Sequence, residues 1–181
     1  MYIKRICFPV KTLGPGNRVG IWTTGCNRFC DGCMSTDLQR MESGKNVPVK
    51  EIMRILGRID GDIAGVTISG GEPFLQPCEL LELVQGIRIQ ITEDIIVYSG
   101  YTIDELREQN DPNINMILQE ISVLIDGPYI DELNDGQGIR GSSNQSIHIL
   151  RECASYQDLD TCKRNLQSFR YGGKILMIGV Q

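Results

Sequence analysis

Short apolar runs rich in β-branched residues recur along the chain, and each run ends at a glycine or a polar residue. Such runs predict buried strands, because a strand covered on both faces needs an almost continuous apolar sequence. The runs are residues 18–24, 64–69, 94–99, 121–126 and 146–150.

The segments between these runs place apolar residues at the spacing of a helix face. The positions are Val49, Ile52, Met53 and Leu56 after Pro48, and Leu80, Leu81, Val84 and Ile87 after Pro77. Thr102 and Glu105 have the spacing of a capping box, which predicts another helix start. We expect these segments to form helices on the outside of the sheet.

Strands that alternate with helices favour parallel pairing through right-handed crossovers. With about six core strands, the expected fold class is α/β, an open, partial parallel β/α barrel formed by one domain over residues 1–181. Ligands of such sheets bind at the carboxyl ends of the strands.

The C-terminal segment carries a weaker helical pattern. Leu159, Cys162, Leu166 and Phe169 predict one more helix, Gly172-Gly173 its end, and residues 174–180 a final strand.

Composition narrows the functional classes. The formal net charge is −5 and the Lys and Arg residues are scattered, so the basic surface of a nucleic-acid binder is not expected. No apolar run approaches the roughly 18 residues of a membrane span, which predicts no membrane association. The short apolar stretch at the N-terminus is broken by Pro9 and Lys11, so we expect no signal peptide and a cytoplasmic location.

Three of the seven cysteines, Cys26, Cys30 and Cys33, form a C-x3-C-x2-C array directly after the first predicted core strand. An odd cysteine count without an export signal favours metal ligands and buried thiols over disulfides. A structural zinc site needs four closed ligands, and the only histidine, His148, lies far along the chain. The spacing also differs from that of bacterial ferredoxins, whereas three thiolates on a [4Fe–4S] cluster would leave one iron open.

This array resembles the signature of the radical S-adenosylmethionine (SAM) superfamily. The second core strand ends in TISGGEP, which looks like the Gly-Gly-Glu motif of that superfamily. GPGNR, VYSGY, LIDGPY and RGSSNQSIHIL are similar to segments of the activating components of anaerobic ribonucleotide reductases, the smallest activators of glycyl-radical enzymes. The resemblance spans roughly residues 11–151 and implies a partial barrel of the radical SAM type.

The resemblance also implies the chemistry. In that family the open iron of the [4Fe–4S] cluster binds the amino and carboxylate groups of SAM, and one electron cleaves SAM to methionine and a 5′-deoxyadenosyl radical. The radical takes a hydrogen atom from a glycine of a large partner enzyme. The chain is thus expected to be a radical SAM oxidoreductase whose partners are a glycyl-radical subunit, most simply anaerobic ribonucleotide reductase, and a flavodoxin- or ferredoxin-type reductant.

The motifs give a set of expected site residues. Cys26, Cys30 and Cys33 would hold the cluster. Gly70 and Gly71 lack side chains and let backbone approach a ligand, and Glu72 offers a carboxylate to the SAM ammonium group. The remaining expected SAM contacts are Ser99, Asp126, Arg140, Ser142 and Asn144. For each of these five the alternative is a local turn or a polar loop.

The other four cysteines, Trp22 and His148 are expected to have structural roles. Cys7, Cys78, Cys153 and Cys162 match no second cluster and are interpreted as small buried side chains. Trp22 and His148 lie in predicted strands and are expected in the core.

The length of the chain limits what could cover the site. The sheet and its helices use roughly 150 residues, so few residues are left to form a lid. An uncovered barrel mouth would admit a loop of another protein. Two alternatives stay open: a radical SAM enzyme acting on a peptide or small metabolite, and a non-catalytic electron carrier with one cluster.

Overall fold

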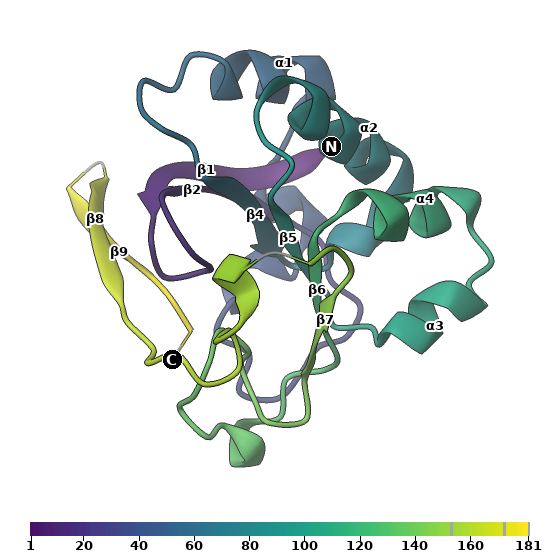
Figure 1. Ribbon diagram of the computed structural model, residues 1–181, viewed down its shortest axis with the longest axis vertical. Coiled ribbons are helices and arrows are strands. Elements are labelled where there is room, and N and C mark those ends of the chain that lie inside the picture. The colour runs from purple at the N-terminus through teal and green to yellow at the C-terminus, as the bar shows by residue number, and fades with distance from the viewer. Residues whose placement is uncertain (153, 172, 181) are drawn as a thin grey trace.

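The computed structural model describes residues 1–152, 154–171 and 173–180. Within these residues the main sheet has seven strands in the order β3-β1-β2-β4-β5-β6-β7, and β3 and β7 form its two open edges (Figure 1). Its strands are β1 (Tyr2–Val10), β2 (Arg18–Thr23), β3 (Lys45–Asn46), β4 (Gly65–Gly70), β5 (Ile95–Tyr98), β6 (Val123–Asp126) and β7 (Ser146–Ile149).

The centre of the sheet is parallel. β2, β4, β5 and β6 pair in parallel register, with Val19 opposite Val66 and Ile68 opposite Val97. All five predicted core strands are therefore confirmed within a residue or two, as is an α/β fold with an open, mostly parallel sheet.

The edges of the sheet differ from the prediction. β1 was not predicted; it pairs antiparallel with β2, and its partly exposed positions carry Lys4 and Arg5, which break the apolar run. β7 pairs antiparallel with β6. A parallel pairing needs a long crossover, usually a helix, and the described chain between β6 and β7 contains only a single 3₁₀ turn, Asp131–Leu133.

In the described part of the chain, four α-helices cover the outer face of the sheet (Figure 1). They are α1 (Val49–Leu56), α2 (Pro77–Gln90), α3 (Ile103–Glu108) and α4 (Pro112–Glu120). α1 and α2 begin at the predicted prolines, and the Thr102–Glu105 capping box at α3 is present in both directions. Among the described residues, no helix has the length and apolarity needed to cross a membrane.

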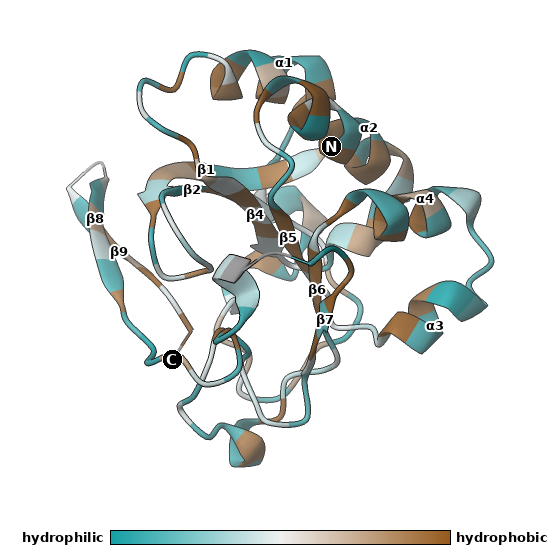
Figure 2. Ribbon diagram, in the orientation of Figure 1, coloured by the Kyte–Doolittle hydropathy of each residue, from teal (hydrophilic) through white to brown (hydrophobic). Residues whose placement is uncertain are grey.

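The helices and the sheet enclose the main hydrophobic core. In Figure 2 the central strands are brown, while the helices alternate between brown and teal sides. Fully buried residues such as Ile52 of α1, Leu80 and Val84 of α2 and Ile68 of β4 belong to one continuous cluster. This packing holds the parallel strands in place, so their carboxyl ends form a fixed rim.

The C-terminal segment forms a β-hairpin where a helix followed by a strand was predicted. The helix expected around residues 159–169 is wrong, because β8 (Gln167–Tyr171) is extended and pairs antiparallel with β9 (Lys174–Ile178). Gln167 and Phe169 are partly buried and Ser168 and Arg170 exposed, which is the period of a strand. The predicted final strand is confirmed as β9, although it joins this separate hairpin rather than the main sheet. Gly172, like Cys153 and Gln181, lies outside the described residues.

Candidate active site

A cavity of about 310 Å³ opens at the carboxyl ends of β2, β4 and β5. It brings together seven of the predicted site residues, from three separate stretches of sequence. These residues are Cys26, Cys30, Cys33, Gly70, Gly71, Glu72 and Ser99. The sheet thus places the cysteine array and the Gly-Gly-Glu motif in one site, as expected for ligands at strand ends.

Backbone hydrogen bonds hold the cysteine loop against the sheet. The Gly25 N–H donates to the Leu38 carbonyl and the Cys26 N–H to the Gln39 carbonyl, at 2.9 Å each. The Glu72 N–H donates to the Gly25 carbonyl at 2.7 Å. These bonds close the loop on itself and join it to the Gly-Gly-Glu turn.

Backbone N–H groups also point at two of the thiols. The Arg28 N–H lies 3.5 Å from Cys26 Sγ, and the Ser35 N–H lies 3.4 Å from Cys33 Sγ. Burial raises the pKa of the Cys26 thiol above its usual value, and the neighbouring N–H groups oppose this effect. Hydrogen bonds to sulfur are among the features that tune iron–sulfur clusters.

The three thiols line one cavity. In the described part of the chain, no three Cys, His, Asp or Glu side chains are grouped to hold a single metal ion. Each thiolate of a [4Fe–4S] cluster binds a different iron, so cluster ligands stand further apart than the ligands of one ion. Three thiols that line one cavity, with N–H groups directed at two of them, supply ligands of the kind that a [4Fe–4S] cluster takes.

Contacts from the start of α3 fix the middle of the cysteine loop. Asn27 Nδ2 donates to the Tyr101 hydroxyl at 2.5 Å. The Arg28 guanidinium lies 4.9 Å from the centre of the Tyr101 ring and pairs with Glu105 at 3.2 Å. Arg28 also lines the cavity. Sequence analysis missed this residue, because its neighbours on α3 are more than seventy positions away.

The two glycines of the motif are required by close backbone contacts. Gly70 has φ = +126°, and a Cβ there would lie 2.3 Å from the Thr23 carbonyl oxygen. A Cβ on Gly71 would lie 2.2 Å from the Gly25 carbonyl oxygen. The strand end can approach the cysteine loop this closely only without side chains.

Glu72 is fully buried in the wall of the site. Its carboxylate accepts hydrogen bonds from the Phe74 N–H at 3.0 Å, the Ser99 hydroxyl at 3.1 Å and the Gly100 N–H at 2.7 Å. Burial raises the pKa of Glu72 to about 7, although these hydrogen bonds act in the opposite direction. The carboxylate thus joins the turn after β4 to the turn after β5. A cation close to Glu72 would stabilise its ionised form.

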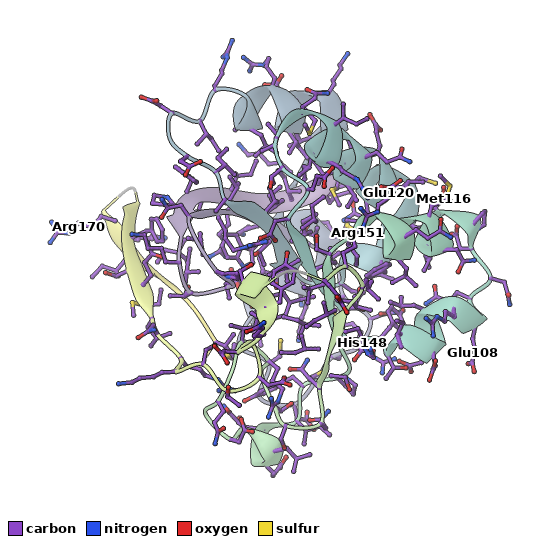
Figure 3. All side chains as sticks on the ribbon, viewed as in Figure 1. Glu108, Met116, Glu120, His148, Arg151 and Arg170 are labelled. Atoms are coloured by element: carbon purple, nitrogen blue, oxygen red, sulfur yellow. The ribbon has the colours of Figure 1, made fainter. Side chains whose placement is uncertain are left out.

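Asp126 does not line the cavity among the described residues. Its carboxylate accepts a hydrogen bond from the Ile103 N–H at the start of α3 and lies 3.0 Å from Nε2 of His148. The His148 side chain, labelled on β7 in Figure 3, is 31% exposed, so its expected place in the core is not found. The bond from Ile103 fastens α3 to the end of β6, and the contact with His148 lies between β6 and β7.

Arg140, Ser142 and Asn144 of the RGSSNQ segment do not line the cavity and bind to other parts of the protein. Arg140 pairs with Asp135 at 2.7 Å and with Asp160 at 3.3 Å. The Ser142 hydroxyl accepts from the Ile130 N–H, and Asn144 Nδ2 donates to the Pro128 carbonyl. These bonds order the loop between β6 and β7. Four residues of this loop line the cavity, namely Gly127, Tyr129, Gly141 and Gln145.

The cavity wall contains further residues that the sequence did not single out. Trp22, expected in the core, is 8% exposed and also lines the cavity. Residues 177–180, from the end of the chain, form part of the wall as well. Their local sequence gives no sign of a role in the site. They reach the cavity only because the C-terminal segment folds back onto the main sheet.

The remaining described cysteines have mixed environments. Cys7 and Cys162 are partly buried, whereas Cys78 is exposed, so its expected burial is wrong. Cys153 lies outside the described residues.

Comparison with known families defines the class of protein. Residues 12–148 match the family described as a 4Fe-4S single cluster domain. This stretch contains the cysteine array, the Gly-Gly-Glu motif, strands β2 to β6 and most of β7. The match agrees with the predicted [4Fe–4S] cofactor.

Individual relatives narrow the class further. The chain is 35% identical over 153 residues to the anaerobic ribonucleoside-triphosphate reductase-activating protein of Escherichia coli K12, covering 80% of this chain and 96% of the relative. It is 34% identical to the protein of the same name from Vibrio cholerae, covering 78% and 94%. A pyruvate formate-lyase-activating enzyme of Clostridium pasteurianum is 31% identical, covering 71% of this chain and 54% of that enzyme. The chain belongs to the family of anaerobic ribonucleoside-triphosphate reductase-activating proteins.

Proposed function

We propose that this protein is a radical SAM enzyme that activates an anaerobic ribonucleoside-triphosphate reductase by forming a glycyl radical on it. The observation that carries the proposal is the cavity in which three thiols and the Gly-Gly-Glu turn meet at the carboxyl ends of the parallel strands. The names of the relatives, which are activating proteins and an activating enzyme, support the same reaction class.

In this proposal Cys26, Cys30 and Cys33 hold the [4Fe–4S] cluster through their thiolates. The bound cluster and SAM supply one-electron chemistry that produces the 5′-deoxyadenosyl radical. The protein contributes a fixed loop, N–H groups directed at Cys26 and Cys33, and a cavity lined by the backbone of Gly70 and Gly71.

Glu72 and Ser99 are the proposed polar contacts for SAM. Both line the cavity. The Glu72 carboxylate would accept hydrogen bonds from the SAM ammonium group. Asp126, Arg140, Ser142 and Asn144 act on the site indirectly, by holding α3 and the loop that carries Gly141 and Gln145. We assign these residues a positioning role.

The proposal includes a cytoplasmic location and a flavodoxin- or ferredoxin-type reductant. Both are supported by the chemistry of the site, because a cluster with an iron that lacks a thiolate is best kept in a reducing compartment. The chain is proposed to act as one domain over residues 1–181.

The test combines two measurements on the protein reconstituted with iron and sulfide under anaerobic conditions. With SAM and dithionite, the wild type is expected to form 5′-deoxyadenosine, and Cys30→Ala is expected to form none. When the large reductase subunit of the same organism is added, a glycyl radical should appear by electron paramagnetic resonance.

Each outcome separates the candidate functions. Formation of 5′-deoxyadenosine without a glycyl radical would overturn the assigned partner and favour a peptide or metabolite as substrate. A cluster that forms but supports no SAM cleavage would favour the electron carrier.

A further inference from the structure

The C-terminal hairpin β8–β9 is an addition to the matched family region, which ends at residue 148. In Figure 1 the hairpin lies at one side of the main sheet. The Gln167 side chain holds it there, accepting from the Lys11 N–H at 3.0 Å and donating to the Pro9 carbonyl at 2.8 Å. Ile178 and Val180 are buried in a cluster with Trp22, so the end of the hairpin is part of the cavity wall.

The two faces of the hairpin differ in what covers them. Phe169 and Leu176 pack inward against the cluster around Trp22. The opposite face, which we call the outer face, carries Leu166, Ser168, Arg170, Ile175 and Met177. Its residues are placed together by the register, which sets Ser168 opposite Met177 and Arg170 opposite Ile175.

The outer face is apolar and exposed. Leu166 is 50% exposed, Ile175 69% and Met177 50%. Large exposed apolar side chains that lie together mark interaction sites more often than isolated ones do. Met177 also lines the cavity, so this face continues directly into the active site.

The charge of the hairpin is opposite to that of the whole chain. Residues 167–178 contain two basic residues, Arg170 and Lys174, and no acidic residue, whereas the formal net charge of the chain is −5. In Figure 3 the labelled Arg170 side chain points away from the body of the molecule. A partner segment that lies on this face would therefore be favoured if it combined apolar and acidic side chains.

We propose that the outer face of the β8–β9 hairpin docks an apolar and acidic segment of the reductase subunit and guides the glycine of that subunit into the cavity. The inference rests on the proposed function, since it takes the reductase as the partner. It adds the surface on which that partner binds and the chemistry of the segment it presents.

The test measures binding of the purified large reductase subunit to the reconstituted enzyme by titration calorimetry. Ile175→Glu is expected to raise the dissociation constant about tenfold or more, because it adds a negative charge opposite an acidic segment. Ile175→Lys should weaken binding clearly less. Ile89→Glu on α2, where the side chain is 81% exposed and remote from the hairpin, is the matched control and should bind like the wild type.

A second measurement isolates docking from chemistry. Without the subunit, Ile175→Glu should form 5′-deoxyadenosine from SAM at the wild-type rate, while its glycyl-radical yield falls with the weaker binding. Wild-type binding by Ile175→Glu, or equal losses for Glu and Lys, would overturn the docking inference and leave the proposed function standing. A wild type that neither binds nor activates the subunit would overturn both.

Discussion

Gly71 lies where backbone from two loops leaves no room for a side chain. In Gly71→Ala the added Cβ would meet the Gly25 carbonyl oxygen at 2.2 Å and the Leu38 carbonyl oxygen at 2.9 Å. Both contacts are with backbone, so the cysteine loop must shift. We expect the variant to incorporate less than half of the wild-type iron and sulfide, as measured by chemical analysis after reconstitution.

Gly57→Ala is the matched control for this substitution. Gly57 has φ = −66° at the end of α1, and a Cβ there would make only an ordinary contact with the Met53 carbonyl oxygen at 3.5 Å. This variant should take up a full cluster. Normal cluster content in Gly71→Ala would show that the loop adapts without losing its function.

The buried carboxyl group of Glu72 gives the protein without cofactor a specific pH dependence. Its pKa is raised by burial from the ordinary 4.5 to about 7. Between these values the folded protein keeps a proton that the unfolded chain has released, so the stability that this group contributes falls as the pH rises and is lost above about pH 7. Glu72→Gln removes this dependence.

Urea denaturation at about pH 5 and about pH 8 measures the effect. On going to the higher pH, the free energy of unfolding of Glu72→Gln should gain up to about 3 kcal/mol relative to the wild type. Parallel pH profiles for the two proteins would contradict the assignment.

At the residue scale, local motifs were enough to find the centre of the site. Cys26, Cys30, Cys33 and the Gly-Gly-Glu turn are short patterns whose chemistry does not depend on distant residues. Arg140 could not be assigned in this way, because a guanidinium suits a ligand carboxylate as well as Asp135 and Asp160. Only the fold decides between such partners.

At the scale of elements, one ion pair joins three parallel strands at their amino ends. Arg18 at the start of β2 is fully buried and pairs with Asp94, just before β5, at 2.7 Å, and its Nε donates to Thr67 of β4. Removing the carboxylate in Asp94→Ala leaves a buried charge without its counter-ion. The free energy of unfolding should fall by about 3 kcal/mol or more in chemical denaturation.

An exposed ion pair gives the comparison for Asp94→Ala. Glu51 and Arg54 face each other on the surface of α1, where water screens the interaction. Glu51→Ala should leave the denaturation midpoint unchanged. Equal effects of the two substitutions would show that the Arg18 pair adds nothing to the joining of the strands.

The predictability of each element follows from its surroundings. β2, β4, β5 and β6 are covered on both faces, so their continuous apolar runs could be recognised. β1 and β8 lie at exposed margins, where charged and polar residues interrupt the pattern. The spacing of Leu159, Cys162, Leu166 and Phe169 imitated a helix, although the first three precede β8 and only Phe169 lies in it.

At the scale of the whole molecule, few contacts hold the hairpin to the body. Gln167 makes two hydrogen bonds to the end of β1, and each bond contributes about 1 kcal/mol. In Gln167→Ala the amide hydrogens of β8 and β9 should exchange at least several times faster, while the main sheet keeps its protection. Hydrogen–deuterium exchange read by mass spectrometry provides the measurement.

Exchange rates unchanged in Gln167→Ala would mean that the cluster around Trp22 alone fixes the hairpin. Residues 177–180 form part of the cavity wall, which the sequence did not predict. A segment so late in the chain contributes to the site only through long-range packing, which local sequence patterns do not report.

The contacts between the cysteine loop and α3 have a consequence for how the protein matures. Asn27 and Arg28 are held by Tyr101 and Glu105 through bonds that involve no iron. The loop that carries the thiols is therefore attached to the start of α3 by side chains other than the cysteines. Substitutions at Tyr101 or Glu105 should lower cluster loading although every thiolate is still present.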